Sequence, residues 1–169
     1  LRVLNAGGRP VESLPVAEAR KVLADVQAAV EVDLSGIDER EREIVADGHA
    51  LTLHLVRPHG SRGRLPYFVF IHGGGWVLGD YPTHRRLIRD LVVESEVAAV
   101  FVDYTPSPEA KYPQAVDEIY AAVKWVAEND AELDLDRRRM ALVGNSAGGN
   151  MALAAALLPP FGRWCCCGP

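Results

Sequence analysis

The segment Gly144-x-Ser146-x-Gly148 is the feature that most constrains how this chain folds. An apolar run at 140–143 precedes it and an Ala/Leu-rich run at 151–158 follows it, which predicts a strand and a helix joined by a tight turn. This arrangement is typical of a nucleophile elbow, in which a strained turn holds a serine above a parallel sheet. A Cβ at either glycine would clash within such a turn. The alternative is a chance match in a Gly-rich loop, and the flanking strand and helix patterns favour the elbow.

The composition indicates one globular domain without a basic binding surface. The chain has 169 residues, of which 49% are hydrophobic, and this fits a prior of roughly 100–200 residues per domain. Its net charge of -5 gives no reason to expect nucleic acid or an anionic membrane as a partner. The first eight residues lack the apolar core of a signal peptide, and 147–158 is too short to span a bilayer. We therefore expect a cytoplasmic protein, and an initial Leu in place of Met is what a trimmed or partial chain would show.

The hydrophobic pattern predicts a hairpin followed by alternating strands and helices. An amphipathic helix is expected at 16–31 and a charged connector at 35–43. Asp47-Gly48 favours a tight hairpin turn between strands at 43–46 and 50–57, with His54 facing water. Further strands are expected at 67–71, 97–102 and 140–143, and helices at 83–94, from 113 onward and at 151–158. This order predicts an α/β fold with right-handed crossovers and a mostly parallel sheet.

A second Gly-rich segment, His72-Gly73-Gly74-Gly75-Trp76, follows the first interior strand. Its backbone N–H groups therefore lie at the carboxyl edge of the sheet, where ligands bind in such folds. A phosphate-binding loop is one interpretation, but neither Gly-x-Gly-x-x-Gly nor a Gly-Lys-Ser/Thr ending is present. We favour an oxyanion hole, because glycines let N–H donors approach the position where negative charge develops, with Ala147 supplying a further donor.

Both motifs and the segments between them resemble the hormone-sensitive-lipase-like esterases (family IV) of the α/β-hydrolase superfamily. The connecting segments that carry the resemblance are Val102-Asp103-Tyr104, Ser107-Pro108-Glu109 and Tyr112-Pro113-Gln114-Ala115-Val116. The similarity runs from the first helix to Leu157. It implies an α/β-hydrolase fold, hydrolysis of small-molecule esters with short to medium acyl chains, and no cofactor or metal.

The same resemblance implies roles for individual residues. Ser146 would be the nucleophile, the backbones of Gly74, Gly75 and Ala147 would form the oxyanion hole, and Gly73 would shape the loop. Residues 1–40 would form a cap-like helical segment, and 41–158 the N-terminal part of the hydrolase domain.

The chain departs from the family pattern after Ser146. A serine nucleophile needs a histidine base oriented by an acid, and in this superfamily the acid and then the base follow the serine. No Asp, Glu or His follows Ser146, and all five histidines precede it. The segment 159–169, which holds the three consecutive cysteines, reads as an aberrant tail with no metal-site spacing. We hypothesise a truncated esterase, arising from a frameshift, an alternative end or a prediction error.

Three functions remain open at this stage. The chain is an esterase by descent with weak residual hydrolysis, a non-catalytic protein that binds esters, or an inactive fragment whose last strand has an exposed apolar edge. Asp103 is expected to order the loop that follows it, and Glu109 could reach the site. The sequence does not fix the oligomeric state.

Overall fold

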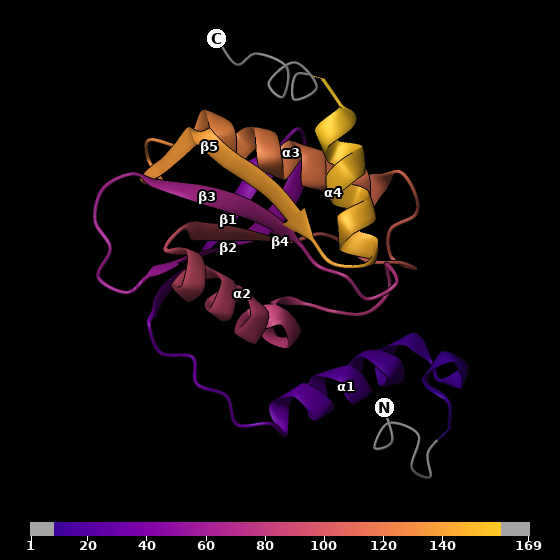
Figure 1. Ribbon diagram of the computed structural model, residues 1–169. Coiled ribbons are helices and arrows are strands. Elements are labelled where there is room, and N and C mark those ends of the chain that lie inside the picture. Colours follow the sequence, from indigo (N-terminus) through magenta and orange to yellow (C-terminus); the bar gives the residue numbers. More distant parts are fainter. Residues whose placement is uncertain (1–8, 160–169) are drawn as a thin grey trace.

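The strands form one mixed sheet, and the loops that follow its three parallel strands leave it at the same edge. The computed structural model describes residues 9–159, and the sheet within them has the order β1-β2-β4-β3-β5 (Figure 1). The strands are β1 (Ile37–Ala46), β2 (His49–Pro58), β3 (Leu65–Ile71), β4 (Ala98–Asp103) and β5 (Leu135–Gly144). β3 pairs in parallel with β4 and β5, whereas β2 pairs antiparallel with β1 and β4.

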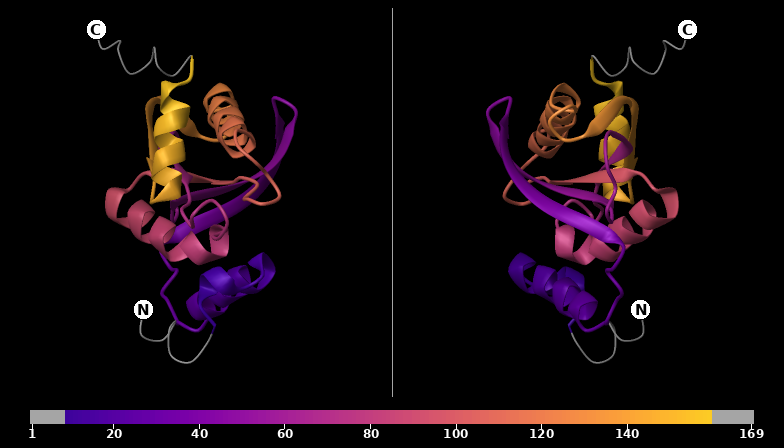
Figure 2. Two further views of the ribbon diagram at one scale, coloured as in Figure 1. Left: turned by 90° about the vertical axis from the view of Figure 1, so that its right-hand side faces the viewer. Right: turned by 90° about the vertical axis from the view of Figure 1, so that its left-hand side faces the viewer.

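The helices cover the two faces of the sheet. α3 (Gln114–Glu128) and α4 (Ala147–Leu157) lie together on one face, and α2 (Tyr81–Ser95) lies on the other, with α1 (Val16–Ala28) beyond α2 (Figure 2). A short 3-10 turn, Val11–Ser13, precedes α1. Two apolar clusters follow from this layering, a larger one under α3 and α4 and a smaller one under α2. The predicted α/β-hydrolase fold class is thereby confirmed in its strand and helix order.

The hairpin confirms the turn expected at Asp47-Gly48. Both residues have positive φ, 47° and 86°, as a two-residue hairpin turn requires, and Ala46 pairs with His49 across it. Leu51, Leu53 and Leu55 are buried, as their alternation predicts. No helix within residues 9–159 combines the length and the apolar character that crossing a membrane requires.

Two strands begin earlier than the sequence pattern predicts. The segment expected to be a charged connector is largely strand, because β1 begins at Ile37, and β5 begins at Leu135 and not at Met140. Both are outer strands of the described sheet, and their first halves carry charged side chains. Pairing with β2 runs along the whole of β1, whereas β5 pairs with β3 at Leu135 and then from Met140 onward, with a bulge between. The polarity of both first halves hides them from a hydrophobicity pattern.

His54 and Asp103 occupy positions that differ from the prediction. The His54 side chain is 13% exposed, and its ring stacks on Tyr81 with the ring centroids 3.9 Å apart. His54 Nε2 lies 2.9 Å from Asp103 Oδ2, so Asp103 pairs with the hairpin. The loop after β4 is held by Glu118 instead, whose buried carboxylate accepts a 2.7 Å hydrogen bond from Thr105 N. His54 faces α2 rather than water because Tyr81, the first residue of that helix, covers it.

The N-terminal helix is less buried than its amphipathic pattern suggests. α1 ends at Ala28, Ala19 is its buried residue, and Val26 and Val30 are 36% and 53% exposed. α1 packs chiefly on α2, so its apolar stripe has little surface to cover. The tail predicted to be aberrant, with Cys165, Cys166 and Cys167, lies outside the described residues except for Pro159.

Candidate functional site

β5 and α4 are joined by a turn with a strained serine. Ser146 has φ 52° and ψ −121°, a conformation that costs free energy for a residue with a Cβ, and such strain is concentrated at functional sites. Gly148 N donates a 2.9 Å hydrogen bond to Asn145 O, which closes the turn. A Cβ at Gly144 would lie 2.5 Å from the carbonyl of Gly148. Ser146 is exposed at the top of this turn.

Strand register brings the two Gly-rich motifs together. Ile71 of β3 pairs with Gly144 of β5, so the loop that follows each strand leaves the sheet at the same place. Gly73 N donates a 2.9 Å hydrogen bond to Asn145 Oδ1. A Cβ at Gly73 would lie 3.1 Å from Ser146 Cβ and 2.5 Å from Asn145 O. Glycine at this position therefore lets the loop lie directly against the serine.

The Gly-rich loop has a backbone that side chains would disfavour. Gly74 has φ 131° and Gly75 has φ 61°, and a Cβ at Gly74 would lie 1.9 Å from Leu78 O. Leu78 N donates a 2.9 Å hydrogen bond to Gly74 O, so a tight turn closes the loop. Ala147 is the first residue of α4, where backbone N–H groups have no partner within the helix. Glycine therefore permits the backbone of the loop, and α4 begins directly after Ser146.

Comparisons with known proteins give the family. Residues 68–159 match the α/β-hydrolase fold family. The chain belongs to that family. The carboxylesterase NlhH of Mycobacterium tuberculosis is 41% identical over 119 residues, which cover 70% of this chain and 37% of the relative. A thermostable esterase from Pseudomonas putida ECU1011 is 57% identical with a TM-score of 0.88, covering 90% of this chain and 48% of that one. The carboxylesterase EstE1 from a metagenomic library is 34% identical with a TM-score of 0.78, covering 86% of this chain and 50% of that one.

These relatives confirm the resemblance to carboxylesterases that the motifs predict. The chain spans roughly two fifths to half of the length of the relatives described above.

A buried histidine supports the Gly-rich loop of this α/β-hydrolase from behind. His72 is 1% exposed and stacks against Tyr104 and Phe101, with centroid distances of 4.3 Å and 5.5 Å. Its Nδ1 lies 2.9 Å from Gly73 O, which can only accept, so Nδ1 carries a proton. Burial lowers the pKa of His72, which keeps the ring neutral at neutral pH.

Each histidine of the chain is paired with a group other than Ser146. His72 pairs with Gly73 O, and His54 with Asp103. The remaining three contact acidic residues or backbone: His49 with Glu118 at 4.0 Å, His59 with Asp38 at 2.8 Å, and His84 with Asp80 O at 3.1 Å. In residues 9–159, these hydrogen bonds and ion pairs of the five rings thus go to groups other than Ser146. Among residues 9–159, no group of three or more His, Cys, Asp and Glu side chains could hold a metal ion.

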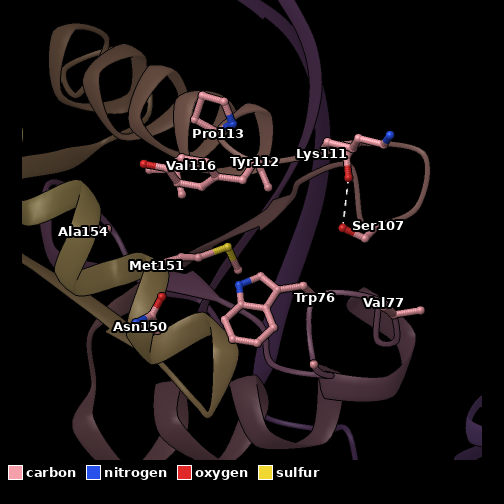
Figure 3. Close-up of a pocket in the computed structure, with 13 residues that line it drawn as sticks. Trp76, Val77, Ser107, Lys111, Tyr112, Pro113, Val116, Asn150, Met151 and Ala154 are labelled. Carbon is pink, nitrogen blue, oxygen red and sulfur yellow. Dashed lines mark hydrogen bonds between the residues drawn. The ribbon is translucent and has the colours of Figure 1, made fainter. Parts of the chain in front are cut away.

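An apolar pocket adjoins the two motifs. It has a volume of about 420 Å³, within the range of small-molecule sites. Trp76 borders it from the Gly-rich loop, Met151 from α4, Ser107 from the loop after β4 and Val116 from α3 (Figure 3). Gly75 and Asn150 also line it, although Ser146 itself does not. The pocket therefore lies beside the serine, with room for the apolar portion of a small molecule.

Sequence reasoning missed two residues that organise this site. Asn145 ties the elbow to the Gly-rich loop, and its only signal is its place next to Ser146 inside the motif. Arg20 of α1 hydrogen-bonds to Val77 O and pairs with Glu109, which the sequence suggested as a residue that could reach the site. Contacts between residues this far apart in the chain leave no local pattern.

Proposed function

We propose that this chain carries the nucleophile and the oxyanion hole of a serine carboxylesterase acting on small-molecule esters with short to medium acyl chains. The observation that carries the proposal is the contact between the two motifs, with Gly73 N 2.9 Å from Asn145 Oδ1. Relatives named as esterases and carboxylesterases support the same reaction class.

In this proposal Ser146 Oγ bonds to the ester carbonyl carbon and gives its proton to water, while the π electrons of the C=O bond move to the carbonyl oxygen. Collapse of this intermediate breaks the bond to the alcohol, which leaves, and water then hydrolyses the acylated serine. The carbonyl oxygen becomes negatively charged and is stabilised by the backbone N–H groups of Gly74, Gly75 and Ala147. Removing one such donor typically costs about 10²- to 10³-fold in rate. Gly73 brings the loop close enough for this geometry, and the pocket beside Trp76 takes an apolar part of the ester. No metal or organic cofactor enters this scheme.

The proton on Ser146 Oγ has no histidine acceptor in the described residues. Without acid and base, binding and an oxyanion hole still accelerate acyl transfer by about 10³- to 10⁴-fold over water. The isolated chain should therefore hydrolyse activated esters slowly.

The test is hydrolysis of p-nitrophenyl butyrate by the chain and by Ser146→Ala. We expect a slow rate that Ser146→Ala lowers, because the serine is the attacking group, down to the part that binding and the oxyanion hole supply by themselves. Ser95→Ala is the matched control, since Ser95 Oγ donates to Leu91 O at the end of α2, a helix on the other face of the sheet. Equal rates for the chain and Ser146→Ala would exclude serine-dependent hydrolysis.

A second function is binding of esters without turnover. The observation that favours it is the pocket of about 420 Å³ in a chain whose histidines all pair elsewhere. The ketone 2-hexanone has the shape of a short ester and no leaving group, and Trp76 is 46% exposed at the pocket. Saturable quenching of tryptophan fluorescence by 2-hexanone, absent in Trp76→Phe, together with no serine-dependent hydrolysis would favour this second function.

A further inference from the structure

Arg20 joins the N-terminal helix to both loops that border the pocket. Its Nε donates a 2.8 Å hydrogen bond to Val77 O, and its Nη2 donates a 3.0 Å bond to Ser107 O. Its guanidinium also pairs bidentately with Glu109, at 2.8 Å and 2.7 Å. One planar cation thus contacts the end of the Gly-rich loop and two points of the loop after β4.

These two loops are also joined to each other and to the core. Ser107 N donates a 2.7 Å hydrogen bond to Trp76 O, and the buried carboxylate of Glu118 fixes Thr105 N at 2.7 Å. Arg20 closes this network from the outer side. Val77 and Ser107, whose carbonyls Arg20 holds, both line the pocket.

Val77 lies close to the predicted oxyanion donors along the chain. The turn that contains it is closed by hydrogen bonds from Val77 N and Leu78 N to Gly74 O, at 3.2 Å and 2.9 Å. A displacement of Val77 O would therefore also displace Gly74 and Gly75. A positional error of about 1 Å in a reacting geometry can cost on the order of 10²-fold in rate.

α1 has few other contacts that could hold it against the loops that border the pocket. Ala19 is its buried residue, and the ion pair of Lys21 with Asp25 stays inside the helix. The hydrogen bonds from Arg20 lower the pKa of Glu109 to about 2, so both partners remain charged at neutral pH. Arg20 is a charged contact between α1 and the site that persists under ordinary conditions.

We propose that Arg20 is a positioning residue that couples the seating of α1 to the geometry of the Gly-rich loop. This inference rests on the proposed function, because the loop matters for rate only if it stabilises an oxyanion. The planar fork of arginine suits three acceptors in different directions, whereas lysine offers a single point charge. The coupling is reciprocal, so whatever orders the loop also favours the seated helix.

The first experiment measures amide hydrogen exchange in the 169-residue chain. Arg20→Ala should speed exchange about tenfold or more in 74–79 and 104–111, while exchange in β3 and β4 stays unchanged. Lys21→Ala is the matched control, since it removes a neighbouring cation of α1 that touches neither loop. Unchanged exchange of both loops in Arg20→Ala would overturn the proposal without reference to any activity.

The second experiment separates positioning from simple attachment. Arg20→Ala should lower kcat for Ser146-dependent p-nitrophenyl butyrate hydrolysis by about 10- to 100-fold and leave KM within about twofold. Arg20→Lys should not restore kcat, whereas guanidinium ion at about 10 mM should restore part of it to Arg20→Ala. Full activity of Arg20→Lys, or an unchanged kcat in Arg20→Ala, would reduce Arg20 to an attachment and overturn the proposal. Absence of any Ser146-dependent rate in the parent chain would contradict the proposed function, and the exchange experiment would still decide the coupling.

Discussion

Gly148 occupies a position where no side chain fits. A Cβ there would lie 2.0 Å from Ile71 O and 2.6 Å from His72 O, both backbone atoms of the neighbouring strand and loop. Gly148→Ala should lower the free energy of unfolding by about 3 kcal/mol, because the elbow and β3 would have to separate. Gly149 is the matched control, since a Cβ there would meet Gly144 O at 3.1 Å, a contact that a small shift relieves.

Gly149→Ala should change the free energy of unfolding by no more than about 1 kcal/mol, since a gain in helix propensity offsets the tight contact. Urea unfolding of both variants measures the difference. Similar destabilisation by the two substitutions would contradict the close packing of the elbow on β3.

His72 should make the chain less stable in mild acid. Burial lowers its pKa in the folded chain, while the unfolded chain binds a proton near pH 6.5, so below that pH the unfolded state holds more protons. The contribution of the neutral His72 ring to the free energy of unfolding is therefore fully present above pH 6.5. It falls as the pH drops, by at most about 1.4 kcal/mol per pH unit, until the pKa of the folded state is reached.

Urea unfolding at several pH values between 7.5 and 5.5 would measure this slope. His72→Phe should reduce it, although His84, whose pKa burial also lowers, keeps part of it. An unaltered slope in His72→Phe would show that His72 accepts its proton without loss of stability.

At the scale of elements, α2 begins with a reciprocal cap that also ends the Gly-rich loop. Asp80 Oδ1 accepts a 2.9 Å hydrogen bond from Thr83 N, and Thr83 Oγ1 accepts one of the same length from Asp80 N. Asp80→Ala should lower the free energy of unfolding by about 1 kcal/mol. Glu94→Ala, on the same helix and away from the cap, should have a smaller effect. Thermal unfolding compares the two, and equal shifts in Tm would argue against the cap.

The elements show which parts of the fold a hydrophobic pattern can predict. Interior strands such as β3 and β4 are nearly continuous apolar runs and were located within about two residues, a normal uncertainty for element ends. The charged first halves of β1 and β5 give no such signal. β1 is a strand there because it pairs with β2 throughout, and β5 pairs with β3 at Leu135 before a bulge that ends at Met140. Periodicity detects burial, and a strand half that is not buried has no such signal.

The sequence predicts the two motifs of the candidate site but not the contacts that hold them in place. The two Gly-rich motifs predict a turn and a loop, and their placement after parallel strands predicts that they meet. The contacts that fix them, from Asn145 to Gly73 and from Arg20 to Val77, depend on side-chain reach across 72 and 57 residues of sequence. Local spacing does not encode such contacts, so the sequence pattern around Arg20 predicts an amphipathic helix and nothing more.

At the scale of the whole molecule, one side of the described structure is apolar and open. Within residues 9–159, β5 pairs with β3 and has no strand on its other side. Beside it, α4 exposes Leu153 and Leu157 by 64% and 73%. Val143 and Ala141 of β5 line an apolar groove of about 300 Å³ on the opposite face of the sheet. A strand edge flanked by exposed apolar side chains favours pairing between chains.

This surface predicts self-association of the 169-residue chain. Replacing both Leu153 and Leu157 with lysine should raise the dissociation constant at least about tenfold. A tenfold change corresponds to about 1.4 kcal/mol of binding free energy, and burial of each leucine contributes about 1.5–3 kcal/mol. Val45→Lys is the matched control, since Val45 is 73% exposed on β1, at the other edge of the sheet from β5. Sedimentation velocity over a range of concentrations measures the equilibrium. A parent chain that stays monomeric at high concentration would contradict the prediction. Equal weakening by Val45→Lys would also contradict it, because the effect would then come from added charge and not from the open side of the sheet.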